Sequence, residues 1–178
     1  TLRDAGITTR IALLEGVLSR DEAIEAAGLR LEIVIHDRWQ LELLASLPME
    51  TPLAVWFKLD SGMHRLGFPL SDARSLNDAL RAHPNWQLQG WITHLACADD
   101  LASGMTQAQI AAFETATAGI PGERSIANSA GLIAWPQARV DWVRPGLMLY
   151  GASPMPGRIG ADLGLKPAMH VASRLIAV

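Results

Sequence analysis

Short apolar runs alternate with longer stretches of helical spacing along most of the chain. The apolar runs predict strands at residues 10–14, 31–35, 54–57, 86–95, 124–127 and 140–143. Helical stretches follow most of these strands, at residues 19–27, 37–47, 71–82, 104–118 and 130–135. Because each strand-then-helix unit is long enough for a right-handed crossover, the repetition predicts a parallel sheet.

Residues that favour helix ends bound several of these helices. Ser19 and Glu22 have the spacing of a capping box, and Gly28 is expected to end that helix. Ser71 is expected to cap the third helix. The second helix, which Pro48 should end, takes its expected apolar stripe from Trp39, Leu41, Leu43 and Leu44.

The arrangement of polar residues favours a barrel over a doubly wound sheet. A Gly-x-Gly-x-x-Gly motif does not follow the first strand, whereas polar residues close several successive strands. A complete eight-unit barrel takes ~250 residues, so residues 1–152 are expected to form a partial (β/α)8 TIM-like barrel. Residues 153–178 are expected to be a linker and the first extended segment of a C-terminal β domain.

The stretch from Ala54 to Phe68 changes abruptly from apolar to ionisable residues where its strand ends. Lys58 and Arg65 accompany a single nearby carboxylate, Asp60, so a site that they share should favour an anion. Two glycines, Gly62 and Gly67, indicate tight turns or a closely bound group. The alternative interpretation is a solvated loop after a strand.

Composition and charge limit the kinds of binding partner that the chain is expected to have. The chain has 178 residues, of which 49% are hydrophobic and 19% charged, and a formal net charge of -3, which is typical of a globular protein. No basic cluster with interleaved aromatic residues predicts nucleic-acid binding, and no apolar run approaches the ~20 residues of a membrane-spanning helix. A single cysteine, Cys97, allows neither an intrachain disulfide nor a zinc pair, so we expect no metal and, by default, a cytoplasmic protein.

Further candidates stand at the ends of later strands. His94 follows an apolar strand, where a lone histidine is more often a packed residue than a functional one. Asn128 and Ser129 begin a helix and could bind a phosphate group, although they could equally serve only as a cap. Arg144 and Gly146 form a second such turn, where glycine lets backbone amides approach an anion.

Four motifs together resemble bacterial alanine racemase, a pyridoxal phosphate enzyme with a barrel and a C-terminal β domain. They are FKLDSGMHRLG at residues 57–67, THLA at 93–96, ANSA at 127–130 and VRPGLMLYG at 143–151, in the order of that family. The resemblance implies a homodimeric parent protein that interconverts L-alanine and D-alanine with pyridoxal 5'-phosphate, for peptidoglycan synthesis or alanine catabolism. It also implies that the chain is an internal piece of that protein.

The same resemblance assigns roles to residues around the cofactor and the substrate. Lys58 matches a lysine that can be carbamylated and then orients Arg65, which reaches the phenolic oxygen of the cofactor and the substrate carboxylate. His94 matches the histidine that supports a cofactor-contacting arginine, and Arg144 matches the arginine that faces the pyridine nitrogen. Because an arginine stays protonated, it disfavours protonation of that nitrogen, which suits a racemase better than a transaminase.

The phosphate of the cofactor is assigned to residues of the last two motifs. Asn128 and Ser129 belong to one of these, and Gly146 and Leu147 match ligands that bind through their backbone. The family's cofactor-linking lysine and catalytic tyrosine have no match in this chain, which is therefore not expected to racemise alanine alone. The alternatives are a broad-specificity racemase or a decarboxylase of the same superfamily, or a non-catalytic module that binds the cofactor.

Overall fold

A computed structural model describes residues 1–47, 52–175 and 177. Its strands are β1 (Ala12–Leu13), β2 (Glu32–Ile35), β3 (Leu53–Asp60), β4 (Phe68–Pro69), β5 (Trp86–Ile92) and β6 (Glu123–Ser125). Its α-helices are α1 (Arg20–Gly28), α2 (Arg38–Ala45), α3 (Ala73–Ala79), α4 (Met105–Thr117) and α5 (Ser129–Ala134). Short 3-10 helices are η1 (Leu70–Asp72), η2 (Leu80–Ala82), η3 (Pro136–Ala138), η4 (Leu147–Tyr150) and η5 (Gly160–Leu163).

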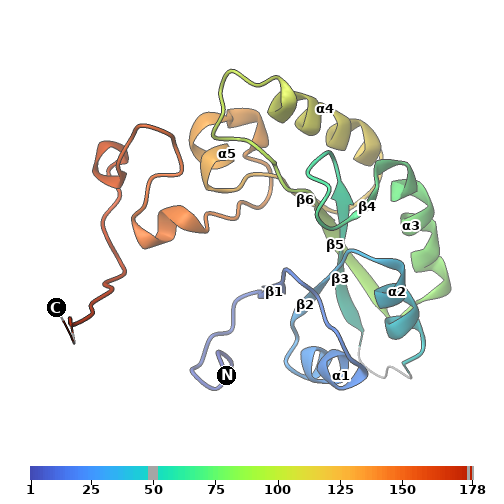
Figure 1. Cartoon of the computed structure of the whole chain (residues 1–178). Helices are drawn as coiled ribbons and strands as arrows, with labels where there is room; N and C mark the ends of the chain where they lie inside the picture. The colour runs from blue at the N-terminus through green and yellow to red at the C-terminus, as the bar shows by residue number, and fades with distance from the viewer. Residues whose placement is uncertain (48–51, 176, 178) are drawn as a thin grey trace.

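The strands form one parallel sheet in the order β1-β2-β3-β5-β6, and β4 pairs with the end of β3. Helices α1 to α4 lie around the outside of the strands in chain order, and the arc is open between β1 and α5 (Figure 1). Each strand in this order is reached from the one before it by a helical crossover, as the alternating pattern predicts, whereas β4 follows β3 through the loop at residues 61–67. The expected partial barrel is confirmed.

The prediction that residues 140–143 form a strand is wrong. Within the described part of the chain, this segment forms one isolated bridge, between Ser125 and Trp142. Its backbone runs beside β6, with Trp142 donating to the carbonyl of Arg124 at 3.0 Å and Arg144 to that of Ala127 at 2.9 Å. It lies at the open edge of the arc, where pairing on one side alone gives a short, irregular contact.

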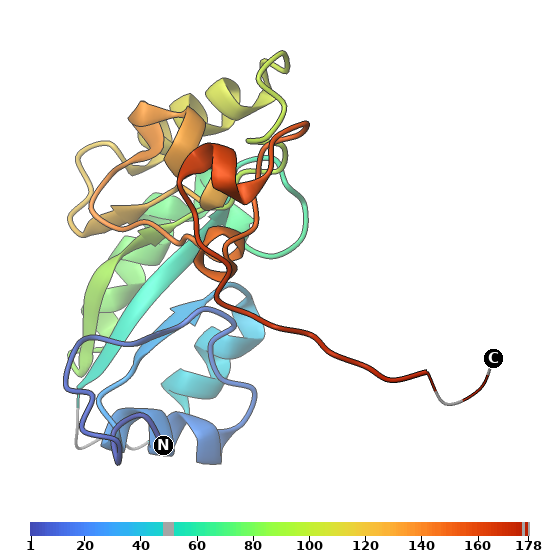
Figure 2. The same cartoon turned by 90° about the vertical axis from the view of Figure 1, so that its left-hand side faces the viewer.

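Two other strands are shorter than predicted by more than one residue, and residues 165–175 form no strand. The strand expected at 10–14 is Ala12–Leu13, and the one expected at 86–95 ends at Ile92. The backbone N–H of Ala168 donates to the carbonyl of Tyr150 at 3.2 Å. Beyond it, the chain to residue 175 runs away from the rest of the described structure (Figure 2), where it has no neighbouring strand with which to form a ladder. The expected tail residues Ile176 and Val178 lie outside the described residues.

The first helix ends differently from the prediction. Ser19 caps α1 as expected, accepting from the N–H of Glu22 at 3.2 Å. The Glu22 carboxylate accepts from Leu18 at 2.7 Å, one residue before the expected partner. Gly28 is the last helical residue, not the stop, and the chain turns at Arg30, whose φ is 52°.

The second and third helices also carry corrections. Asp37 caps α2, and Leu41, Leu43 and Leu44 of the expected stripe pack against the core. Trp39 does not belong to the buried side, because it is 41% exposed, whereas Gln40 is buried. The expected stop at Pro48 lies outside the described residues. Ser71 does not cap α3, because it lies within η1, which leads directly into that helix.

Side chains alternate along β2 and β3 between the helix layer and the interior of the arc. Residues such as Ile33, Val55 and Phe57 belong to the large core under the helices. Val34, Trp56 and Ile92 form a separate core with Trp142 on the other face of the sheet. This inner core lies beneath the polar residues at the carboxyl ends of the strands.

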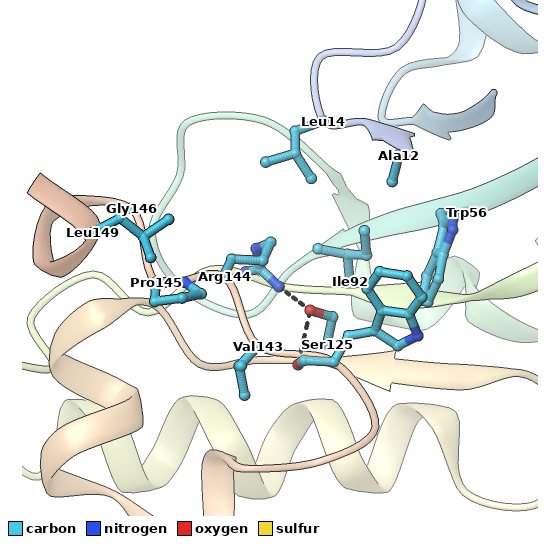
Figure 3. Close-up of a pocket in the computed structure, with 11 residues that line it drawn as sticks. Ala12, Leu14, Trp56, Ile92, Ser125, Val143, Arg144, Pro145, Gly146 and Leu149 are labelled. Atoms are coloured by element: carbon cyan, nitrogen blue, oxygen red, sulfur yellow. Dashed lines mark hydrogen bonds between the residues drawn. The ribbon is translucent and has the colours of Figure 1, made fainter. Parts of the chain in front are cut away.

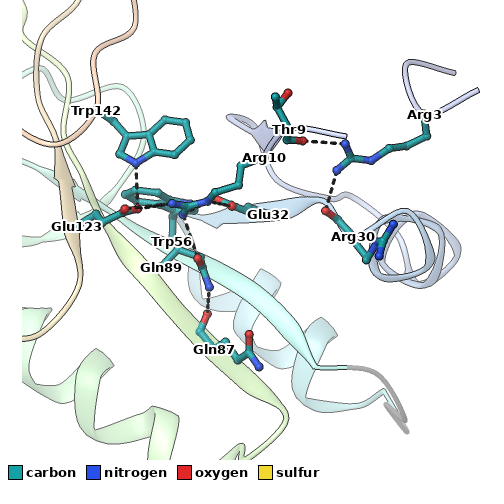
Figure 4. A network of polar contacts seen from close by, with 10 residues as sticks. All are labelled: Arg3, Thr9, Arg10, Arg30, Glu32, Trp56, Gln87, Gln89, Glu123 and Trp142. Atoms are coloured by element: carbon teal, nitrogen blue, oxygen red, sulfur yellow. Dashed lines mark hydrogen bonds and ion pairs between the residues drawn. The ribbon is translucent and has the colours of Figure 1, made fainter. Parts of the chain in front are cut away.

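Below the inner core, a polar network closes the amino-terminal end of the strands (Figure 4). Arg10 is ion-paired with Glu32 and donates to Glu123 at 3.0 Å. The indole of Trp56 donates to Glu32 at 2.6 Å, and that of Trp142 donates to Glu123 at 2.9 Å. Since these polar groups satisfy one another at this end, the carboxyl ends of the strands are the side left for a ligand.

Candidate functional site

Two adjoining cavities lie at the carboxyl ends of the strands. The first, of about 410 Å³, is lined by Leu14, Glu15, Lys58, Arg65, Leu66, Ile92, His94, Arg144 and Gly146. The second, of about 350 Å³, is mainly apolar and includes Trp56, Trp142 and Leu149 (Figure 3). Leu14, Ile92, Arg144 and Gly146 line both cavities, so the two are parts of one hollow.

The structure brings together residues that are far apart in the sequence. Lys58 lies near the end of β3, and Arg65 in the loop that follows it. His94 stands just beyond β5, and Arg144 follows the segment that runs beside β6. All four line the first cavity, as expected when parallel strands end at one edge.

Lys58 is buried, with 8% of its surface exposed. Burial lowers the pKa of its ammonium group, and the charges of Arg65 and Arg144 lower it further. The charge of Asp60 opposes this shift, with a smaller effect than burial or the two arginines. Its carboxylate accepts from Gly62 at 2.9 Å and from both the backbone and the ring of His64. The cavity therefore carries uncompensated positive charge, which favours an anion.

His94 is uncharged at neutral pH. Burial lowers the pKa of its imidazole to about 4, and the cations Arg144, Arg65 and Lys58 add to the shift. A neutral imidazole retains one nitrogen lone pair that can accept a hydrogen bond. This state agrees with a supporting role beside an arginine, and it excludes His94 as a cation at pH 7.

Arg144 is held by three groups from two neighbouring segments, the end of β5 and the end of β6. Its guanidinium donates to the Ser125 hydroxyl and to the backbone carbonyls of Thr93 and Ile126. Figure 3 shows the contact with Ser125, which in turn donates to the carbonyl of Trp142 at 3.1 Å. Burial lowers the pKa of Arg144 to about 10, so the group remains a cation at neutral pH in a fixed orientation.

The loop that carries Arg65 is folded tightly, as its glycines predict. Gly62 and Gly67 have φ angles of 136° and 132°, and a Cβ at Gly67 would lie 2.8 Å from the backbone nitrogen of Asp60. Pairing of Leu59 with Phe68 closes the loop at its base. Arg65 is thus presented by a constrained turn and not by a loose connector.

Asn128 acts as a helix cap. Its side-chain oxygen accepts from Gly131 at 2.9 Å, and its nitrogen donates to the carbonyl of Leu95 at 3.3 Å. Both ends of the amide are therefore occupied within the protein. The geometry supports the capping interpretation for this side chain, and we do not place it among the proposed cofactor contacts.

Ser129 and the turn at residues 146–148 lie next to each other. The Ser129 hydroxyl accepts from the backbone N–H of Met148 at 3.3 Å. Leu147 is the first residue of η4, so its N–H has no acceptor within that helix. The expectation for Gly146 needs a correction, because its N–H donates to the Arg144 carbonyl at 2.9 Å and closes a tight turn instead of facing a shared anion.

Sequence reasoning missed two residues that hold the site together, Ser125 and Gln109. Ser125 is a polar residue within a predicted strand, and Gln109 is a polar residue on the apolar face of a predicted helix; both are buried. A buried polar side chain must find partners, so each position could have been marked as a hydrogen-bonding centre.

The described residues contain no group of three or more His, Cys, Asp or Glu that could hold a metal ion. None of their helices is long and apolar enough to cross a membrane.

Comparison with known proteins points to one family. The family described as "Alanine racemase, N-terminal domain" matches residues 1–154. The chain is 48% identical over 181 residues to an alanine racemase of Halorhodospira halophila, covering 99% of this chain and 49% of that protein. It is 46% identical to an alanine racemase of Shewanella baltica, covering 99% and 50%. The chain thus spans about half the length of the curated relatives it matches.

Solved structures agree with this result. A crystal structure of the biosynthetic alanine racemase from Pseudomonas aeruginosa has a TM-score of 0.88 and 42% identity, covering 94% of this chain and 47% of that one. The alanine racemase structure from Acinetobacter baumannii has a TM-score of 0.81 and 35% identity, covering 93% and 47%. The strand order and curvature described above are therefore those of the corresponding half of these proteins.

Proposed function

The chain belongs to the alanine racemase N-terminal domain family, and from this premise we propose that it is the cofactor-holding part of a pyridoxal 5'-phosphate-dependent alanine racemase. The observation that carries the proposal is the convergence of Lys58, Arg65, His94 and Arg144 on one cationic cavity. Alanine is the proposed substrate, and the proposed complete protein is a cytoplasmic homodimer that supplies or consumes D-alanine.

The residues present fit the cofactor in size and charge. The two joined cavities of about 410 and 350 Å³ offer a polar half for an anion and an apolar half for a ring. Three cations line the polar half, and the one carboxylate that lines it is Glu15. A phosphorylated pyridine with a phenolic oxygen has matching chemistry.

Arg144 is proposed to donate to the pyridine nitrogen. Its other hydrogen bonds, to Ser125 and Thr93, fix the plane of the guanidinium before any ligand binds. Since the group cannot give up its proton at neutral pH, it keeps the ring nitrogen unprotonated. When bound, the cofactor supplies the electron-withdrawing system that acidifies the Cα–H of alanine, and Arg144 limits the extent of that withdrawal.

Arg65 is proposed to bind the phenolic oxygen of the cofactor and the carboxylate of alanine. A guanidinium can make two parallel hydrogen bonds to a carboxylate, which fixes the orientation of the substrate. Lys58 is proposed to be carbamylated, because a neutral amine reacts with carbon dioxide and its lowered pKa favours the neutral amine. The Nζ–C bond would form as one C–O π bond of carbon dioxide opens and the amine releases a proton to water, and the resulting anion would attract Arg65 instead of repelling it.

The phosphate group is proposed to lie against Ser129 and the turn at residues 146–148. Leu147 would donate through its backbone N–H, and Ser129 through its hydroxyl. Neither the φ of Gly146, -70°, nor close packing demands glycine, because a Cβ there would meet no protein atom within 4 Å. The open space beside Gly146 leaves room for a phosphate to approach the backbone of this turn.

The complete protein tests the proposal when it is loaded with pyridoxal 5'-phosphate and given L-alanine. We expect D-alanine to form, and Arg65→Ala to lower kcat/KM by roughly 100-fold or more, in line with the loss of an oriented charge contact. The exposed Arg81 of η2, which lies 3.6 Å from the carboxylate of Asp78 in α3, provides the control Arg81→Ala. Faster turnover of basic amino acids would favour a broad-specificity racemase, and release of carbon dioxide a decarboxylase. Cofactor binding without turnover would favour a non-catalytic module.

A further inference from the structure

Gln109 connects the two sides of the cationic cavity. It lies on α4, is 2% exposed and therefore cannot satisfy its amide with water. Its oxygen accepts from the backbone N–H of Ala96 at 2.9 Å. Its nitrogen donates to the carbonyl of His94 at 3.1 Å and to the hydroxyl of Ser61 at 3.2 Å.

Two of these contacts, those to Ser61 and His94, lead to residues of the proposed site. Ser61 opens the turn that presents Arg65, and its hydroxyl also bonds that of Thr93 at 2.7 Å. Thr93 supplies a carbonyl to Arg144, and its neighbour His94 lines the cavity. One amide therefore ties the Arg65 turn to the strand end that supports His94 and Arg144.

We propose that Gln109 is a positioning residue that sets the placement of Arg65 relative to His94 and Arg144. The inference rests on the proposed function. An amide is the side chain that offers an acceptor and two donors at one point, which matches the three partners found here. Leucine would remove the partner of the Ala96 N–H and of the His94 carbonyl and leave Ser61 with Thr93 alone, and a carboxylate would set an oxygen against the carbonyl of His94.

A role confined to stability makes a different prediction from a positioning role. Thr117 provides the comparison, because it is fully buried on the same helix and far along it from Gln109. Its hydroxyl donates to the carbonyl of Phe113 at 2.9 Å and accepts from Arg124 at 3.1 Å. Thr117→Val removes comparable buried hydrogen bonds without touching a residue that lines the cavity.

The test uses the complete protein with pyridoxal 5'-phosphate and compares Gln109→Leu, Gln109→Glu and Thr117→Val. We expect Gln109→Leu to raise both the dissociation constant of the cofactor and the KM for alanine by about tenfold, and to speed amide exchange at residues 61–66. Thr117→Val should lower the urea midpoint while these constants stay within about twofold of wild type.

Gln109→Glu adds a pH signature and covers the case in which Gln109→Leu does not fold. Burial beside a carbonyl raises the pKa of the new carboxyl, and only its protonated form can donate to His94. The cofactor affinity of this variant should therefore approach the wild-type value as the pH falls from 8.5 to 6.0.

Wild-type constants in Gln109→Leu, a pH-independent ratio of Gln109→Glu to wild type, or an equal effect of Thr117→Val would overturn the inference. Failure of the wild-type protein to bind the cofactor would instead remove the proposed function. In that case, amide hydrogen exchange at residues 61–66 tests the role of Gln109 without the cofactor. Unchanged exchange in the Gln109 variants would contradict the positioning role.

Discussion

Arg144 donates through Nη2 to the backbone carbonyl of Thr93, which lies 51 residues earlier in the chain. The contact joins the last segment of the arc to the end of β5, next to His94. The orientation of Arg144 therefore depends on where β5 lies relative to the segment that runs beside β6. The cavity is in this sense a product of the sheet and not of any one loop.

Arg144→Glu should change the product spectrum of the complete enzyme. A carboxylate favours a protonated ring nitrogen where an arginine disfavours it, so electron withdrawal by the cofactor becomes stronger. We expect pyruvate, the product of transamination, to increase relative to racemisation of alanine by about tenfold or more. The ratio is measured by coupled assays of pyruvate and D-alanine, with Arg81→Glu as a surface control. An unchanged ratio contradicts the assigned role of Arg144.

Lys58→Ala should lower activity by roughly 100-fold, and small anions should restore part of it. The loss follows if the proposed carbamate supplies a negative charge beside Arg65, and acetate or chloride can occupy the space that is left. Rescue is measured as kcat/KM against anion concentration at constant ionic strength. If the variant responds to acetate and chloride no more than the wild-type protein does, the carbamate proposal is wrong.

Because of His94, the free energy of unfolding should decrease as the pH falls from 6.5 towards 4. The pKa of its ring is about 4 in the folded protein and 6.5 ordinarily, so the unfolded state binds more protons between these values. Its contribution to stability is thus fully present above pH 6.5 and is lost as the pH falls towards 4. In His94→Gln, the urea midpoint should depend less on pH across this window. Parallel curves for the two proteins would refute the assignment.

Gly90→Ala should destabilise the protein strongly. An added Cβ would lie 2.1 Å from the carbonyl of Glu123 and 2.5 Å from the ring of Trp56, so the β5–β6 contact has to open. Overpacking of this kind costs about 1–3 kcal/mol or more. Gly104→Ala is the matched control, because a Cβ there meets nothing within 4 Å and the φ is an ordinary -71°. Urea denaturation should show a large loss for the first variant and little change for the second; equal stabilities would mean that Gly90 is not closely packed.

Much of the fold was predictable because it depends on local patterns. The apolar runs at residues 31–35 and 54–57 correspond to β2 and part of β3, and Asp37 and Asn128 cap the predicted helices. The irregular conformation of residues 140–143 was not predictable. Their apolar character is that of a strand, but a ladder depends on pairing that the sequence of one segment does not record.

The candidate site was predictable to the level of residue types at strand ends. Lys58, His94 and Arg144 stand out as polar residues after apolar runs, and the structure places them in one cavity. The hydrogen bonds that fix them were not predictable, because Gln109 and Ser125 meet their partners only through tertiary packing. For the same reason the occupied N–H of Gly146 could not be foreseen from a Pro-Gly turn.

The central claim is that the cavity lined by Lys58, Arg65, His94 and Arg144 holds the cofactor. Amide hydrogen exchange of the complete protein, measured with and without pyridoxal 5'-phosphate, locates the bound group directly. Bound cofactor should slow exchange at residues 58–66, 93–96 and 144–148, and leave α1 and α3 unchanged. Protection confined to the opposite end of the strands, around Arg10 and Glu32, or protection absent from all three segments, would contradict the account.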